Sequence, residues 1–216
     1  MKTVTIRFEN EDNYFIREAF NTLRTNVLFC GTDVKKIVLT STDANEGKTT
    51  VSFSLAKSLA EADRRVLLVD ADLRKSVAVG RYTDLTGVAG LSQLISGQIP
   101  LTDAVYHTQI EGLDAVFAGP FPPNPTELVG SETFRQFLDA VAPHYDYVII
   151  DAPPLGMVVD AAVIAGFCDG AILILHKGKA KYRVAQNVIA QLQKSGCRVL
   201  GAVLNQPVSK RKHSKK

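Results

Sequence analysis

The chain has 216 residues, of which 46% are hydrophobic and 22% charged, a composition that suits one globular domain. Its three cysteines, Cys30, Cys168 and Cys197, form neither an even disulfide framework nor a closely spaced metal pair, so we expect small core residues in a reduced, cytoplasmic protein. The net charge is +3, but residues 210–216 contribute five positive charges, and subtracting them leaves −2, which argues against a nucleic-acid-binding surface.

The N-terminal part of the chain is expected to contain a helix but no membrane anchor. Residues 1–13 lack the apolar core of a signal peptide, and aspartates interrupt the most apolar region of the chain before it could span a bilayer. A helix is predicted at about residues 13–29, with one apolar face that packs on the body of the protein. That face consists of Ile16, Phe20, Leu23 and Val27. The polar side carries Glu18, Asn21 and Arg24.

From residue 36 onward, apolar stretches of strand length alternate with segments of helical period. The stretches rich in Val, Ile and Leu predict buried strands at 36–41, 65–71, 147–151, 170–176 and 198–205. Apolar faces of helical spacing lie within 51–60, 134–141 and 185–192. The alternation predicts an α/β fold with a mostly parallel β-sheet flanked by helices, filling one domain over residues 1–206. Residues 85–126 are rich in glycine and proline turn signals and are interpreted as a long functional excursion.

A phosphate-binding loop is predicted directly after the first of these strands. The segment Ser41-Thr-Asp-Ala-Asn-Glu-Gly-Lys-Thr-Thr50 follows a buried strand and opens a helix, as a P-loop does. Backbone N–H groups would point at phosphate oxygens, Lys48 would add a charge on the β/γ-phosphates, and the Thr49 hydroxyl can bind Mg²⁺. The residues expected to contact ATP are Asp43, Ala44, Asn45, Glu46, Gly47, Lys48, Thr49 and Thr50. Thr42 stands where the P-loop pattern has glycine, and the alternative is a chance Gly-Lys-Thr at a helix start.

Three aspartates follow or end two other predicted strands. Asp70 and Asp72 lie at the end of the 65–71 stretch, and Asp151 ends the 147–151 stretch. Open α/β sheets bind ligands at the carboxyl ends of their strands, so these side chains should face the phosphate site. Any one of them alone could be a turn or helix-cap residue. Beside a P-loop, Asp151 is expected to be the Walker B acid that holds Mg²⁺ directly or through water.

These motifs resemble those of the bacterial tyrosine kinases that control capsule and exopolysaccharide synthesis, whose P-loop NTPase fold is similar to that of the Min and Par ATPases. VLLVDADLRK at 66–75 resembles their Walker A′ element, and VIIDAPP at 148–154 resembles their Walker B segment. Residues 18–26 resemble the family's N-terminal ExxRxxR helix, 90–97 its segment after Walker A′, and 118–128 its PPNPxEL signature. The resemblance covers about residues 14–205.

The resemblance implies an ATP- and Mg²⁺-dependent protein-tyrosine kinase. By that resemblance, the catalytic residues are Lys48, Asp70, Asp72 and Asp151. Thr49, Asp70 and Asp151 would hold Mg²⁺, and Asp70 or, preferably, Asp72 would deprotonate the tyrosine hydroxyl. The resemblance also assigns adenine recognition to Asn205, with Pro207, although without it Asn205 equally fits a strand-terminating turn.

The chain departs from this family in two places. Asn21 stands where the helix motif has arginine, which removes a bidentate donor from the helix that builds a ring of subunits in the family. The family's chains usually end in a tyrosine cluster that is autophosphorylated, whereas no tyrosine follows Tyr182 in this sequence. Autophosphorylation at such a cluster is therefore not expected. The alternative function is an ATP-dependent regulatory or positioning ATPase that phosphorylates no tyrosine.

The expected partners follow from the same resemblance. They are a separate membrane activator of the polysaccharide co-polymerase type, protein tyrosine substrates and further copies of this chain. The activator would recruit a cytoplasmic protein to the inner face of the plasma membrane. Residues 207–216 are expected to form a basic flexible tail that is either simply solvated or held near anionic lipid.

Overall fold

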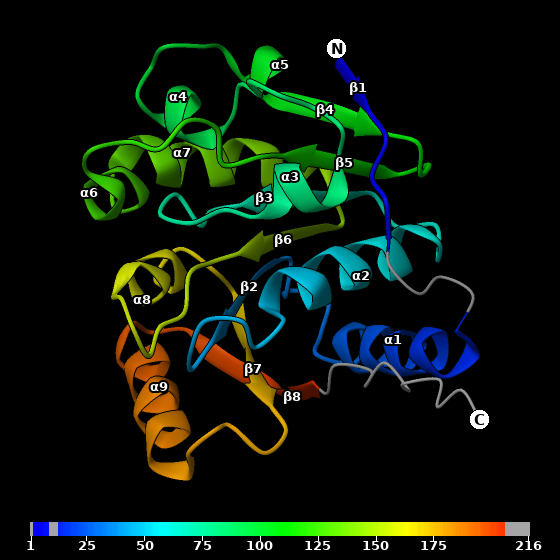
Figure 1. The fold of residues 1–216 in the computed structure, drawn as a ribbon, viewed down its shortest axis with the longest axis vertical. Helices are drawn as coiled ribbons and strands as arrows, with labels where there is room; N and C mark the ends of the chain where they lie inside the picture. Colours follow the sequence, from blue (N-terminus) through cyan, green and yellow to red (C-terminus); the bar gives the residue numbers. More distant parts are fainter. Residues whose placement is uncertain (1, 9–12, 206–216) are drawn as a thin grey trace, which may run out of the picture.

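A computed structural model describes residues 2–8 and 13–205, and within them one eight-stranded sheet forms the centre of the molecule (Figure 1). The strands are β1 (Lys2–Val4), β2 (Lys36–Ser41), β3 (Val66–Asp70), β4 (Val105–Thr108), β5 (Leu113–Val116), β6 (Tyr147–Asp151), β7 (Gly170–His176) and β8 (Arg198–Asn205). Their order across the sheet is β1-β4-β5-β3-β6-β2-β7-β8, and every neighbouring pair is parallel except β4 with β5. The predicted α/β fold with a mostly parallel sheet is confirmed.

Helices cover both faces of the sheet. They are α1 (Tyr14–Leu28), α2 (Lys48–Ala60), α3 (Ala78–Tyr82), α4 (Leu91–Ile95), α5 (Leu101–Ala104), α6 (Pro125–Val129), α7 (Glu132–Val141), α8 (Asp160–Ala165) and α9 (Tyr182–Lys194), with a 3₁₀ turn at Ala142–His144. Alternate strand residues point to opposite faces, so neighbours such as Ile149 and Ile150 belong to different cores. One core gathers residues of α1, α2 and α3, and the other gathers residues of α4 to α9.

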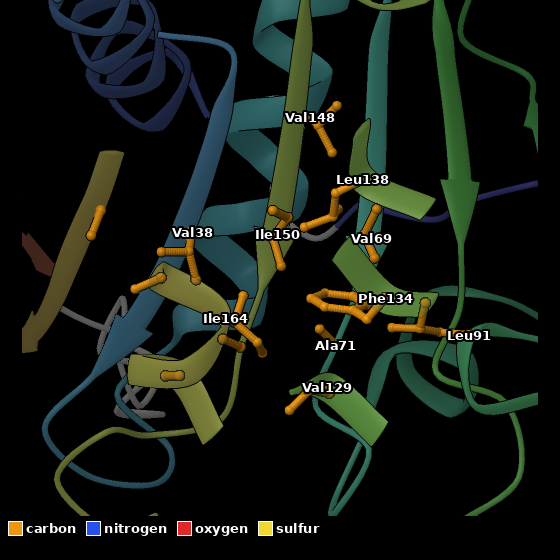
Figure 2. Packing of buried hydrophobic residues seen from close by; sticks show 14 of the residues in the cluster. Val38, Val69, Ala71, Leu91, Val129, Phe134, Leu138, Val148, Ile150 and Ile164 are labelled. Carbon is orange, nitrogen blue, oxygen red and sulfur yellow. The ribbon is translucent and has the colours of Figure 1, made fainter. Parts of the chain in front are cut away.

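The second of these cores is shown in Figure 2, where Phe134 and Leu138 of α7 point towards Val69 and Ile150 of the central strands. Helix α7 begins where the Ser131 side chain accepts a hydrogen bond from the Phe134 N–H, which caps the first turn. Its large apolar residues recur at helical spacing and are buried, as the sequence predicted; they are Phe134, Phe137, Leu138 and Val141.

The interpretation of residues 85–126 as an irregular excursion is wrong in part. The segment contains α4, α5 and two strands of the central sheet, since β5 pairs in parallel with β3 and β4 pairs with β5. Strand β1, which pairs with β4, was not predicted either. These strands have only three or four residues each, which is too short for a pattern of alternation or an apolar run to stand out between turn residues.

Among the described helices, none has both the length and the hydrophobicity that a membrane crossing requires. Strands β5, β3, β6 and β2 lie next to one another and run in the same direction. The loops that leave their carboxyl ends therefore share one edge of the sheet, and this edge carries the residues considered next.

Candidate nucleotide site

The loop between β2 and α2 has the backbone of a tight phosphate-binding turn. Asn45 and Gly47 adopt left-handed conformations, with φ of 60° and 88°. A Cβ atom at Gly47 would lie 2.0 Å from the Asn205 amide nitrogen, so only glycine fits there. Helix α2 begins at Lys48 without a side-chain cap. Its first N–H groups are thus available to an anion, which a helix start of this kind binds well.

Glu46, predicted only as one of the loop residues near ATP, supports the loop from inside. The residue is 3% exposed. Its carboxylate accepts hydrogen bonds from the Thr42 N–H at 2.8 Å, the Thr42 hydroxyl at 2.8 Å and the Asp43 N–H at 3.1 Å. Thr42, the residue that departs from the P-loop pattern, is thus held by a side chain four positions along the chain. The sequence shows that the loop contains a carboxylate, but it does not show that this side chain turns back to bond to the loop backbone.

The predicted catalytic side chains meet at the start of α2. Lys48 Nζ lies 3.0 Å from Asp72 Oδ2 and 3.7 Å from Asp151 Oδ1. The pairing of β3 with β6 places Asp70 directly opposite Asp151. All three aspartates are buried. The structure therefore brings three carboxyl groups together around one lysine.

Burial, together with the nearby charged groups, shifts the pKa values of this site. Burial raises the pKa of Asp70 to about 7, and the neighbouring Asp151 adds to the rise, although Ser76 and Lys48 act against it. Burial also raises the pKa of Asp151, against the opposing effects of Lys48 and Thr49. Burial alone would lower the pKa of Lys48, but the attraction of Asp151 and Asp72 outweighs it and the pKa is raised. One lysine therefore does not balance the negative charge of the three aspartates, whereas an additional bound cation would.

The oxygen atoms at this site match what Mg²⁺ requires when it binds together with a nucleotide. Asp151 Oδ2 is buried without a hydrogen-bond partner among the described residues, and the Thr49 hydroxyl bonds to the same carboxyl group. Within 2–8 and 13–205, no three His, Cys, Asp or Glu residues form a metal site by themselves. Mg²⁺ usually takes only one or two protein carboxylates and completes its shell with water and phosphate. The residues present therefore fit Mg²⁺ that arrives with a nucleotide.

Asn205 ends β8 beside the P-loop. Its side-chain N–H donates to the Glu46 carbonyl at 2.9 Å, and its own carbonyl accepts from the Lys177 N–H at 2.9 Å. Asn205 is thus placed at the predicted site, where it also holds the loop in position. Pro207 and the predicted tail 207–216 lie outside the described residues.

The N-terminal helix differs in one respect from its prediction. Asn21 donates to Glu18 Oε1 at 3.0 Å along the polar side of α1, as expected. Arg24, also predicted on that side, instead donates to the Ser58 carbonyl of α2 at 2.8 Å. Its guanidinium is used within the chain because α1 packs against α2, which a residue pattern in one helix does not reveal.

One further cluster at this edge was not foreseen as a unit. Arg74, Asp160 and Thr126 form a closed set of hydrogen bonds, with Arg74 Nε 2.6 Å from Asp160 Oδ2. Asp160 is 86 residues away from Arg74 in the sequence, and neither spacing nor composition links the two.

Known proteins are similar to this chain in both sequence and fold. A family model described as an AAA domain matches residues 34–176. Tyrosine-protein kinase CpsD of Streptococcus agalactiae serotype III (strain NEM316) is 42% identical over 188 residues, covering 87% of this chain and 81% of the relative. The crystal structure of the chimerical protein CapA2B2 has a TM-score of 0.85 at 31% identity, covering 95% of this chain and 93% of that one.

A more distant solved structure is also similar. The septum site-determining protein MinD of Pyrococcus horikoshii OT3, complexed with Mg-ADP, has a TM-score of 0.67 at 27% identity over 79% of this chain and 70% of that one. The expected likeness to the Min-type P-loop fold is confirmed.

Proposed function

Since the chain belongs to the bacterial tyrosine-protein kinases of the P-loop ATPase class, we propose that it transfers the γ-phosphate of ATP to tyrosine hydroxyls of proteins and thereby regulates capsule or exopolysaccharide synthesis. The proposal rests above all on the approach of Lys48 Nζ to Asp72 at 3.0 Å and to Asp151 at 3.7 Å beside the uncapped start of α2. This arrangement suits phosphoryl transfer, in which a protein mainly positions groups and neutralises charge.

Each side chain has a defined task in this proposal. When bound, ATP supplies the phosphoryl group and Mg²⁺ neutralises phosphate charge. The N–H groups at the start of α2 and the Lys48 ammonium bind the phosphates. Thr49 and Asp151 hold Mg²⁺, with Asp70 as a further oxygen ligand. Asn205, beside Gly47, contributes to the adenine end of the site.

The hydrogen bonds favour Asp72 over Asp70 as the base. Both oxygens of Asp70 already accept hydrogen bonds, one from the Asp72 N–H and the other from the Ser76 hydroxyl. Asp72 uses Oδ1 for the N–H groups of Arg74 and Lys75, while Oδ2 contacts Lys48. Once Lys48 binds phosphate, Asp72 Oδ2 is the atom that accepts the tyrosine proton.

We also infer the partners of the enzyme. A CapA-type membrane activator is proposed because the chain is similar to CapB-type kinases and to the chimerical CapA2B2 protein. Such an activator would hold this cytoplasmic chain at the inner face of the plasma membrane. Assembly of copies through Glu18 and Asn21 of α1 is a further proposal, and the use of Arg24 by α2 speaks against a ring held by that arginine.

The acceptors are tyrosines of other proteins or exposed tyrosines of another copy. Among the described residues, Tyr14 and Tyr182 are exposed, whereas Tyr82, Tyr106 and Tyr147 are buried. The second candidate function, an ATPase switch without tyrosine phosphorylation, is favoured by the likeness to MinD.

One experiment separates the two functions. The purified protein is incubated with labelled ATP, Mg²⁺ and a tyrosine-containing acceptor, and phosphotyrosine and free phosphate are measured separately. Phosphotyrosine that disappears in Asp72→Asn supports the kinase. Release of phosphate without phosphotyrosine would replace it by the ATPase switch.

A further inference from the structure

Arg74, Asp160 and Thr126, here called the Arg74 clamp, form a cyclic hydrogen-bond arrangement. Arg74 Nε donates to Asp160 Oδ2 at 2.6 Å and Nη2 donates to Asp160 Oδ1 at 3.2 Å, so one guanidinium edge faces one carboxylate. Arg74 Nη2 also donates to the Thr126 hydroxyl at 2.7 Å, and that hydroxyl donates to Asp160 Oδ1 at 2.6 Å. Arginine is suited to this task because its planar fork makes two bonds at once, which lysine cannot do.

The clamp joins three segments that leave neighbouring strands at the same edge. Arg74 lies in the loop after β3, Asp160 begins α8 after the loop that follows β6, and Thr126 lies in α6 after β5. Because β5, β3 and β6 are consecutive in the sheet, their outgoing loops are adjacent. Without cross-links, three such loops would be free to move separately at the site where phosphoryl transfer is proposed.

The burial of Asp160 makes its contact with Arg74 important for stability. Asp160 is 2% exposed, whereas the Arg74 side chain keeps 38% of its surface. Burial alone would raise the pKa of Asp160, but hydrogen bonds from Arg74 and Thr126 outweigh it and hold the pKa below its ordinary value. Asp160 is therefore ionised at neutral pH. A buried carboxylate that loses its arginine is strongly unfavourable, so the closed arrangement is the stable one.

The backbone of the clamp arginine also sets the direction of Asp72. The N–H groups of Arg74 and Lys75 donate to Asp72 Oδ1 at 3.3 and 3.0 Å. With Oδ1 held in this way, Oδ2 faces Lys48 at 3.0 Å. A shift of the Arg74 backbone would therefore rotate the carboxylate that the proposed reaction uses as its base.

We propose that Arg74 is a positioning residue, which fixes the Asp72 loop against the segments of Asp160 and Thr126 and so keeps Asp72 Oδ2 in place for phosphoryl transfer. This inference rests on the proposed function of the site. Arg74 touches neither the nucleotide nor the acceptor in this account, and it acts through Asp72.

The test compares the 216-residue wild-type chain with Arg74→Lys, Arg74→Gln and the double variant Arg74→Gln/Asp160→Asn. Phosphotyrosine formation and ATP hydrolysis give kcat and KM, titration with ATP and Mg²⁺ gives Kd, and thermal unfolding gives Tm. We expect Arg74→Lys to lower kcat at least tenfold while the Kd for ATP stays within threefold. Arg74→Gln should lower Tm as well, because it leaves Asp160 buried without a cation.

The double variant separates positioning from stability. Removing both charges should restore the Tm that Arg74→Gln loses, while kcat stays low because the glutamine and asparagine amides cannot reproduce the forked contact. Recovery of kcat together with Tm would overturn the proposal, as would an Arg74→Lys variant with kcat within twofold of the wild type. Arg135→Gln is the matched control, since Arg135 makes a similar forked pair with Glu132 on the exposed surface of α7 and should change neither quantity.

The readouts keep this inference distinct from the proposed function. If the wild type hydrolyses ATP but forms no phosphotyrosine, the kinase proposal fails, and the effect of Arg74 on kcat is read on hydrolysis. If the wild type transfers phosphate to neither tyrosine nor water, both proposals fall.

Discussion

Replacing Asp70 by asparagine removes the group whose protonation the fold changes most clearly. The asparagine has nearly the same shape and can still bond to the Asp72 N–H and the Ser76 hydroxyl, so the fold should persist. In the wild type, the pKa of Asp70 rises from 3.8 to about 7, chiefly through burial. The fold therefore favours the protonated carboxyl group. Its contribution to stability is full below pH 3.8 and is lost as the pH rises through about 7.

The size of the effect follows from the pKa. One pKa unit corresponds to about 1.4 kcal/mol, so the two units between pH 5 and the pKa of about 7 give at most about 3 kcal/mol. Between pH 5 and pH 8, the free energy of unfolding of the wild type should thus fall by up to this amount more than that of Asp70→Asn. Any accompanying fall in the pKa of Asp151 in the variant acts in the same direction.

The assay is urea unfolding followed by circular dichroism at several pH values from 5 to 8, with EDTA and without nucleotide. Titrating groups elsewhere contribute equally to both proteins, so the difference between the two pH curves isolates Asp70. Parallel curves would refute the reasoning, because they would mean that Asp70 is ionised in the fold at pH 5.

Two further changes test the loop and the core. Gly47→Ala places a Cβ 2.0 Å from the Asn205 amide at a φ of 88°, so ATP affinity should fall and unfolding should become easier by about 1–3 kcal/mol. Gly80→Ala, whose Cβ would meet nothing within 4 Å, is the control, and equal melting temperatures for the two variants would contradict the strain. Phe134→Ala, at a fully buried position of α7, should lower the free energy of unfolding in urea by about 3–5 kcal/mol without changing ATP affinity. A loss below about 1 kcal/mol would show that the core around Phe134 is not closely packed.

Strands β2, β3, β6 and most of β7 could be predicted because they are buried on both faces, whereas β8, at the edge of the sheet, has its predicted range but is not buried as expected. Strands β2, β6, β7 and β8 coincide with their predicted ranges, and β3 differs by one residue at each end. A buried parallel strand has a continuous run of apolar residues, which can be recognised in a single sequence without an alignment. Strands β1, β4 and β5 are shorter and lie towards one side of the sheet, so their residues give no such run.

The same distinction applies to the candidate site. Lys48, Asp72 and Asp151 could be brought together from sequence because each begins, follows or ends an element whose position the motif fixes. A local sequence pattern does not show which way a side chain points or which residues far away in the sequence it contacts. The inward carboxylate of Glu46 and the contact between Arg74 and Asp160 are therefore features that only the fold reveals.

The proposed kinase function requires that the loop before α2 binds the nucleotide. Titration of ATP with Mg²⁺ into wild type and Lys48→Met tests this directly. The methionine keeps much of the length of the lysine side chain but removes the charge that binds phosphate. Wild type should bind one ATP per chain, and Lys48→Met should weaken binding at least a hundredfold while remaining folded by circular dichroism. Unchanged ATP affinity in a folded Lys48→Met variant would contradict the assignment.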